Sequence, residues 1–214
     1  RVYDRWRRDE YAPLTNEEAA DVVADAMGEI PEYTRLQRVQ RDIPADFIDA
    51  GVWKSNLRQL AAQRAEEKGI EVRDIRAREV GMNEADPDPD RVELGVTKYD
   101  AAKGTEFFLA FEDPVADLLV GFCRLRFPYE PVRAELQDAA VVRELHVYGS
   151  EAGIGGDGEW QHRGYGRRLL ARAEEIAEDA GYDKLSVISG IGVRQYYREK
   201  LGYYQDGPYV STTL

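Results

Sequence analysis

Hydrophobic residues recur at helical spacing near the start of the chain. Thr15 is followed three positions later by Glu18, the arrangement of a capping box in which each residue satisfies a free amide of the other. Apolar residues then repeat every three or four positions until Pro31, which cannot continue a helix. They are Ala19, Val22, Val23 and Met27. The pattern predicts helix over residues 1–30.

Two further stretches of this N-terminal part are interpreted as strands. Residues 33–41 alternate in polarity, with Leu36 and Val39 as their apolar positions. Residues 70–80 have a similar texture, so they predict a second strand.

A helix is expected between these two strands, running to about Lys68. Ser55 or Asn56 can cap its start, and Gly69 can end it because glycine adopts left-handed backbone conformations easily. The order strand, helix, strand predicts one βα unit and the start of another.

An acidic loop with two prolines at 81–90 marks a change of pattern, and we place a boundary there between domains 1–80 and 81–214. Beyond it, residues 92–99 alternate with period two and are the first of four expected strands, which are followed by a long helix, a strand, a short helix and a last strand. We expect these elements at 92–99, 104–112, 118–127, 139–148, after Gly166, 184–189, 191–200 and 207–214.

A glycine-bearing turn, Gln161-His-Arg-Gly-Tyr-Gly166, leads directly into the long helix. The first amides of a helix lack an intrahelical acceptor and carry partial positive charge, and glycine lets a phosphate approach the backbone. The apolar residues that follow form one stripe: Leu169, Leu170, Ala173, Ile176, Ala177 and Ala180. The turn motif is short, so it gains meaning from the strands expected on both sides of it.

The composition is that of a globular protein, with 43% apolar and 33% charged residues and no apolar run near the ~18 residues of a membrane span. No signal peptide is visible, and because the chain starts at Arg1 we expect a fragment or a processed chain. The single Cys123 favours a reducing cytoplasm, and its apolar surroundings favour a buried, inert thiol over a nucleophile.

The net charge of -12 is unevenly distributed, with -3 in residues 1–80 and -9 in residues 81–214. Only 6 of the 29 basic residues are Lys, which indicates either a high-salt cytoplasm or a GC-rich genome. Within the N-terminal part the basic residues form islands that could contact an RNA backbone or pair with neighbouring acids. The candidates are Arg35, Arg38, Arg41, Lys54, Arg58, Arg73, Arg76 and Arg78.

The element order after residue 91 resembles the GCN5-related N-acetyltransferase (GNAT) fold, an α/β fold with a mixed, mostly antiparallel sheet and flanking helices. The resemblance implies that the glycine turn holds the pyrophosphate of acetyl-CoA. It also implies that the strand before the turn splays from its neighbour to admit the pantetheine arm, and that a tyrosine of the later short helix lies near the thioester.

Ordered sequence blocks make the resemblance more specific. They are similar to the catalytic third subunit of Elongator and its archaeal and bacterial single-chain relatives, over essentially the whole chain. The blocks are Arg38–Pro44, Gly51–Leu60, Ile75–Gly81, Arg143–Gly149, Gln161–Gly166, Leu185–Gly190, Val193–Arg198, Leu201–Tyr203 and Asp206–Tyr209.

In that family a radical-SAM barrel is joined to the acetyltransferase domain, and the enzyme forms a carboxymethyl group at C5 of the wobble uridine of tRNA. The resemblance therefore implies acetyl-CoA and the tRNA anticodon stem-loop as partners of this chain, with residues 1–80 as a βα remnant of the barrel plus linker. Full-length relatives also use a [4Fe-4S] cluster and S-adenosylmethionine, whose ligands would lie upstream. We expect no membrane partner, and a homodimer is possible.

The resemblance assigns roles to individual residues. His146 is a candidate general base, although a structural histidine remains an alternative, and Tyr197 is preferred over a partly packing Tyr196 at the thioester. Acetyl-CoA contacts are expected from Glu144, Leu145, His146, Val147, Gln161, Arg163, Gly164, Tyr165, Gly166, Arg167, Arg168 and Tyr197. The eight basic residues named above are the candidate tRNA contacts.

Two points limit this interpretation. Relatives often carry a linker cysteine cluster attributed to zinc, whereas the matching positions here are Val72, Asp74 and Ala77, so we predict no metal. An ordinary acetyltransferase for protein lysines or small amines, and a non-catalytic tRNA-binding piece, remain alternative functions.

Overall fold

The computed structural model describes residues 1–39, 43–83, 85–148 and 164–214. The chain divides into two compact units, residues 1–77 and 78–214. The division into domains at residues 80/81 stays a prediction.

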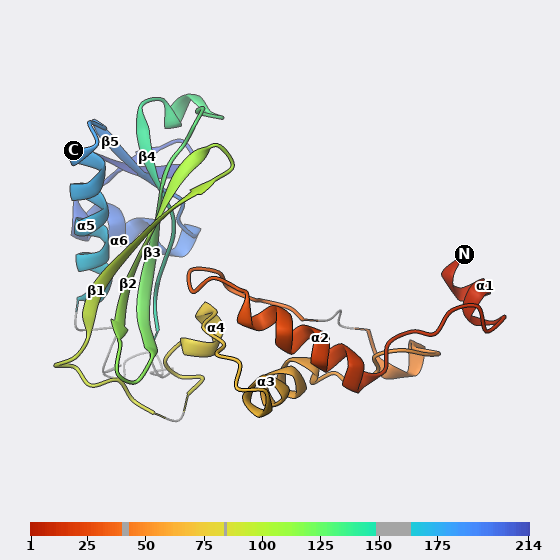
Figure 1. The fold of residues 1–214 in the computed structure, drawn as a ribbon. Coiled ribbons are helices and arrows are strands. Elements are labelled where there is room, and N and C mark those ends of the chain that lie inside the picture. The colour runs from red at the N-terminus through yellow and green to blue at the C-terminus, as the bar shows by residue number, and fades with distance from the viewer. Residues whose placement is uncertain (40–42, 84, 149–163) are drawn as a thin grey trace. The chain divides into compact units, whose positions relative to one another are not determined.

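The N-terminal unit is built from helices (Figure 1). The predicted capping box at the second helix is confirmed: Glu18 N–H donates to Thr15 Oγ1 at 3.2 Å, and Thr15 N–H donates to Glu18 Oε2 at 2.8 Å. The helices are α1 (Val2–Trp6), α2 (Asn16–Gly28), α3 (Leu57–Glu67) and α4 (Ile75–Arg78), with a 3-10 turn at Ala45–Phe47.

Helices α2 and α3 pack through small side chains. Ala19 and Ala20 of α2 are buried together with Leu57 of α3. The predicted stripe is shifted by part of a turn, since Val22 is 58% exposed while Ala24 is fully buried. Alanines let two helices approach closely, so they take the core positions that the larger valine was expected to hold.

The strands expected at 33–41 and 70–80 are wrong within the described residues. Asp74 satisfies the backbone there instead of a neighbouring strand: its carboxylate accepts from Leu36 N–H at 3.1 Å and from Arg76 N–H at 3.3 Å. The second contact caps α4 in the middle of the expected strand. Leu36 and Val39 are three positions apart, a spacing that does not suit period-two alternation.

The C-terminal unit is a seven-stranded sheet in the order β1-β2-β3-β4-β5-β7-β6 (Figure 1). All neighbouring pairs are antiparallel except β4 and β5. The strands are β1 (Glu93–Ala101), β2 (Gly104–Asp113), β3 (Leu118–Phe127), β4 (Ala139–Val147), β5 (Lys184–Val187), β6 (Tyr204–Asp206) and β7 (Tyr209–Thr213). The predicted mixed, mostly antiparallel sheet is confirmed, and the last expected strand is the second half of a hairpin.

In its described residues, this unit also contains the helices α5 (Tyr165–Asp179) and α6 (Arg194–Leu201), the second of which follows a 3-10 turn at Ile191–Val193. Leu169 and Ala173 of α5 are fully buried against sheet residues such as Leu125 and Val142. Tyr197 of α6 belongs to the same core cluster, so both helices cover one face of the sheet.

Candidate functional site

The central feature of the site is the strand β4, whose two edges end their pairing at different points. On one side β4 pairs with β3 as far as Val147. On the other side it pairs with β5 only as far as Val142, whose carbonyl accepts from Ile188 N–H at 2.9 Å. Residues 143–147 thus leave backbone groups on the β5 side without a strand partner in the described part of the sheet. The splayed strand expected from the sequence is present.

The start of α5 lies against this open stretch of β4. Gly164 caps the helix with φ 76°, a left-handed conformation that favours glycine, and a Cβ placed there would meet no atom within 4 Å. A Cβ on Gly166 would lie 3.6 Å from Val147 Cγ2 and 3.8 Å from Leu145 Cδ2, so the helix start and β4 are in close contact.

The amides at the helix start are not all available. Arg168 N–H donates to Gly164 O at 3.1 Å, so its backbone is used within the helix. Its guanidinium lies 4.4 Å from the centroid of the Phe111 ring, a cation–π contact, and the Arg167 guanidinium donates to Lys200 O. The amides of Tyr165, Gly166 and Arg167 precede that first bond to the cap. Gln161 and Arg163 lie outside the described residues.

Glu144 and His146 form a dyad on the sheet face opposite α5. His146 Nε2 lies 3.1 Å from Glu144 Oε1, and Arg124 Nε donates to Glu144 Oε2 at 2.9 Å. A hydrogen bond from His146 and then the Arg124 guanidinium lower the pKa of Glu144, although burial opposes them. Because a neutral imidazole that donates through Nε2 keeps its lone pair on Nδ1, the contact assigns Nδ1 as the basic atom.

Aromatic rings surround this dyad. The Phe122 ring centroid lies 5.4 Å from that of His146, and Tyr148 is nearly parallel to the imidazole at 6.4 Å. The Arg124 guanidinium lies over the rings of Phe108 and Phe122, and its Nη1 donates to the Tyr99 hydroxyl at 3.1 Å. The imidazole is therefore held by contacts to its ring face as well as to Nε2.

The two tyrosines of α6 have roles in packing that are the reverse of those expected. Tyr197 is 5% exposed and packs edge-on to Tyr203 at 5.5 Å, whereas Tyr196 is 47% exposed. Burial raises the pKa of Tyr197 to about 12, so its hydroxyl stays protonated at neutral pH. The inert thiol is confirmed: Cys123 is fully buried, and burial raises its pKa.

The eight candidate tRNA-contact residues differ in how accessible their charged groups are. Arg78 is 2% exposed and donates to Glu112 at 2.7 Å, and Arg58 donates to the fully buried Asp74 at 2.8 Å. These two guanidinium groups are structural, so they leave little surface for an RNA.

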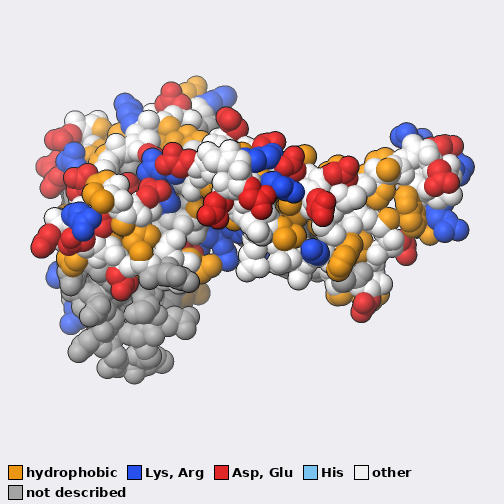
Figure 2. Space-filling model, turned by 60° about the horizontal axis from the view of Figure 1, so that its bottom comes forward, with side chains coloured by type: hydrophobic (Ala, Val, Ile, Leu, Met, Phe, Trp, Pro, Cys, Tyr) orange, Lys and Arg blue, Asp and Glu red, His pale blue; other side chains and the backbone are white. Residues whose placement is uncertain are grey.

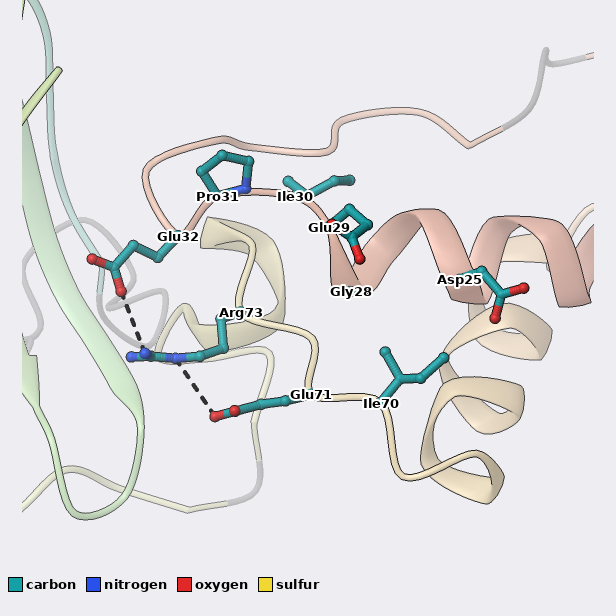
Figure 3. A pocket seen from close by; sticks show the side chains of 9 residues that line it. All are labelled: Asp25, Gly28, Glu29, Ile30, Pro31, Glu32, Ile70, Glu71 and Arg73. Carbon is teal, nitrogen blue, oxygen red and sulfur yellow. Dashed lines mark ion pairs between the residues drawn. The ribbon is translucent and has the colours of Figure 1, made fainter.

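The remaining basic residues are more accessible. Arg73 reaches toward Glu32 and Glu71 beside a groove of about 720 Å³ between the end of α2 and residues 70–73 (Figure 3). Lys54 and Arg38 are exposed, Arg35 and Arg76 are partly exposed, and Arg41 lies outside the described residues. On the face shown in Figure 2, Lys and Arg side chains lie among Asp and Glu side chains on the described parts of both units.

Sequence reasoning missed Arg124. The signal for Arg124 was a charged residue within the apolar strand Leu118–Phe127, because a charge there needs a partner across the sheet. Asp74 was among the neighbouring acids considered as ion-pair partners of the arginines, and it does pair with Arg58, but nothing in the sequence indicated that it is fully buried.

Family models match both units. Residues 70–203 match the model of the acetyltransferase (GNAT) family, and residues 1–67 match a model described as the radical-SAM C-terminal domain. The chain belongs to the acetyltransferase (GNAT) family.

The similarity extends to particular proteins. Proteins named tRNA uridine(34) acetyltransferase, from Methanocaldococcus infernus and Methanocaldococcus jannaschii, are each 46% identical over 222 residues, which cover 100% of this chain and 41% of theirs. Elongator complex protein 3 of Schizosaccharomyces pombe is 44% identical, with 100% of this chain and 40% of that protein covered. The chain thus spans about two fifths of the length of these curated relatives.

A solved structure shares the fold. The archaeal Methanocaldococcus infernus Elp3 with an N-terminal deletion has a TM-score of 0.90 and 46% identity, over 99% of this chain and 52% of that one. The resemblance predicted from the sequence blocks is confirmed. In the described residues, no helix has both the length and the apolar character that crossing a membrane requires.

Proposed function

We propose that this chain is the acetyl-CoA-binding and acetyl-CoA-hydrolysing part of a tRNA-uridine acetyltransferase, acting in the formation of a carboxymethyl group at C5 of the wobble uridine. The observation that carries the proposal is the open edge of β4 beside the glycine-capped start of α5. The names of the curated relatives supply the substrate class.

The residues present suit acetyl-CoA. The open backbone of Glu144–Val147 can pair with the two amide groups of a pantetheine arm in the manner of an added strand. The free space at Gly164 and the amides of Tyr165, Gly166 and Arg167 suit a pyrophosphate at a helix start. When bound, acetyl-CoA would supply an acetyl group activated as a thioester.

Two side chains can carry out the proton transfers that hydrolysis of the thioester needs. His146 Nδ1 takes a proton from a water molecule that attacks the acetyl carbonyl, while Glu144 stabilises the imidazolium that results. The hydroxyl of Tyr197, protonated at neutral pH, gives its proton to the departing sulfur; Tyr196 is the second candidate for this role. In the chain alone, one water is consumed and acetate and free coenzyme A form. Where the acetyl carbon has already been joined to C5 of the uridine, the same hydrolysis would give the carboxylate of the carboxymethyl group and free coenzyme A, and in both cases solvent restores the protonation of the two side chains.

Contacts to tRNA are proposed for the accessible basic residues of the N-terminal unit: Lys54, Arg35, Arg38, Arg73 and Arg76. Arg58 and Arg78 are left out because their guanidinium groups bind acidic residues at or below the surface. The [4Fe-4S] cluster and S-adenosylmethionine would be bound by an upstream portion, because Cys123 is the single cysteine of this sequence and is buried.

The proposal is tested by incubating the chain with acetyl-CoA together with tRNA, with a lysine-containing peptide, or with neither, and by measuring free coenzyme A and acetylated products. We expect coenzyme A release that rises on adding tRNA and no acetyl-peptide. Acetyl-peptide as the main product would place the chain with amine acetyltransferases. Bound acetyl-CoA that is never turned over with any acceptor would favour a non-catalytic tRNA-binding piece.

A further inference from the structure

A second cavity, of about 340 Å³, lies in the C-terminal unit away from the helix start. Its walls come from the β1–β2 turn, the segment after β3, β4, the residue after β5, and β7. The residues that line it include Arg126, Tyr129, Val132, Arg143, Ile188 and Tyr209.

The cavity opens on the sheet face opposite α5. Leu125 and Val142 are paired and belong to the core beneath α5. Their neighbours Arg126 and Val141, which are also paired and line the cavity, point to the other face because side chains alternate along a strand. Ile188 binds Val142 through its amide, so the cavity reaches the point where β4 and β5 part.

Two guanidinium groups are fixed in its wall by one buried carboxylate. Glu106 is 1% exposed, and its Oε1 accepts from Arg126 Nη1 at 2.8 Å and from Arg143 Nη1 at 2.6 Å. Arg126 also donates to Ala101 O and Ala102 O, which holds the β1–β2 turn. A guanidinium has five donors, and in the described residues Arg143 is bonded only through Nη1, so donors remain for a ligand.

We propose that this cavity binds the base that accepts the acetyl-derived group, a pyrimidine with two ring carbonyls. This proposal rests on the proposed function. Its volume lies near the lower end of the ~300–1,000 Å³ of small-ligand sites, which suits a single nucleoside. Tyr129, Tyr209 and Ile188 offer ring faces and apolar surface, on which unstacked bases are commonly bound.

The polar groups favour uracil over cytosine. Carbonyl O4 of uracil can accept a hydrogen bond from Arg143, whereas the exocyclic amine that cytosine carries at the same ring position would place a donor against a donor. Lys103 lies 5.4 Å from the centroid of the Tyr129 ring at the rim, where it can attract the phosphate of the same nucleotide. Arg143 is the extra residue where β4 shifts its pairing with β3, between Val142 and Glu144, so it stays on the face of Glu144 and His146, and the bound base would share the sheet face of the dyad.

The test measures binding of uridine 5′-monophosphate and cytidine 5′-monophosphate to the intact 214-residue chain by NMR titration. We expect R143A to weaken uridine monophosphate binding by at least tenfold, because a hydrogen bond to a charged group is lost. The matched control is R133A, since Arg133 is similarly exposed but pairs with Glu135 outside the cavity. V132W should block the site by filling it, because Val132 is 85% exposed at its edge and tolerates a larger side chain.

Equal effects of R143A and R133A, together with unchanged binding to V132W, would overturn the assignment of the cavity. Equal affinity for the two nucleotides would overturn the choice of base. The experiments distinguish an error in the assignment of the cavity from an error in the proposed function. tRNA-stimulated coenzyme A release without nucleotide binding here refutes only the cavity, and nucleotide binding without such release refutes only the proposed function.

Discussion

Removing the carboxylate of Glu144 tests the dyad directly. Its Oε1 lies 3.1 Å from His146 Nε2, and its other oxygen accepts from Arg124, whose side chain is 11% exposed. A hydrogen bond to a charged group contributes about 1.5–3 kcal/mol, so losing the contact that orients and stabilises the imidazolium should slow acetyl-CoA hydrolysis about 10- to 100-fold. We expect E144Q to show this loss in the rate of coenzyme A release at saturating acetyl-CoA, with its KM little changed.

The state of His146 can be observed independently of activity. The sequence contains two histidines, so 15N-histidine labelling yields two imidazoles, and an H162Q variant assigns them. In the wild type we expect the neutral His146 ring to carry its proton on Nε2. In an E144A variant the preference should weaken toward a mixture of tautomers.

The matched control for this prediction is E175Q. Glu175 accepts from Arg172 at 2.8 Å on the exposed side of α5, so the same substitution breaks an ion pair outside the site. The reasoning is refuted if E144Q and E175Q lower the rate equally, or if the His146 tautomer is the same with and without the carboxylate.

Three further changes test other parts of the structure. D74A should lower the free energy of unfolding of the N-terminal unit by about 3–5 kcal/mol in urea, because the Arg58 guanidinium loses the carboxylate that balances its charge. A loss of less than about 1 kcal/mol would contradict this. G164A and G181A each place a Cβ in open space at positive φ and should cost about 1 kcal/mol alike, but only G164A should weaken acetyl-CoA binding in calorimetry. The contacts to His146 and Arg124 lower the pKa of Glu144 below its ordinary value of 4.5. The ionised carboxylate therefore stabilises the fold above about pH 4.5, and this stabilisation is lost as the pH falls below that value. The stability gap between wild type and E144Q should therefore narrow as the pH is lowered below about 4.5, and a constant gap would count against the ion pair.

The C-terminal unit was predictable because its signals are local. The strand Leu118–Phe127 begins as a continuous apolar run that is too short for a helix of the core, and the stripe Leu169, Leu170 and Ala173 has the spacing of a helix. The N-terminal unit was less predictable from its sequence. The backbone N–H of Leu36 donates to the carboxylate of Asp74, which is 38 residues away in sequence. No local pattern reports a contact between a side chain and a distant backbone group.

Candidate residues could be named more easily than their roles could be assigned. His146 was recognised, but its partner Glu144 was expected to contribute only its backbone. Tyr197 and Tyr196 were both named, yet which of them is buried depends on how α6 meets the sheet. Such choices are decided by tertiary packing, which a motif does not specify.

The acidic charge of the chain limits how it can hold RNA. Phosphate contacts release counterions, and the logarithm of the binding constant falls with the logarithm of salt concentration by about 0.7–0.9 per contact. With Arg58 and Arg78 engaged inside the fold, the proposed contacts are Lys54, Arg35, Arg38, Arg73 and Arg76. Five contacts correspond to a slope of about -3.5 to -4.5, and K54E should reduce its magnitude by nearly one. A slope near zero would mean that phosphates do not bind this unit.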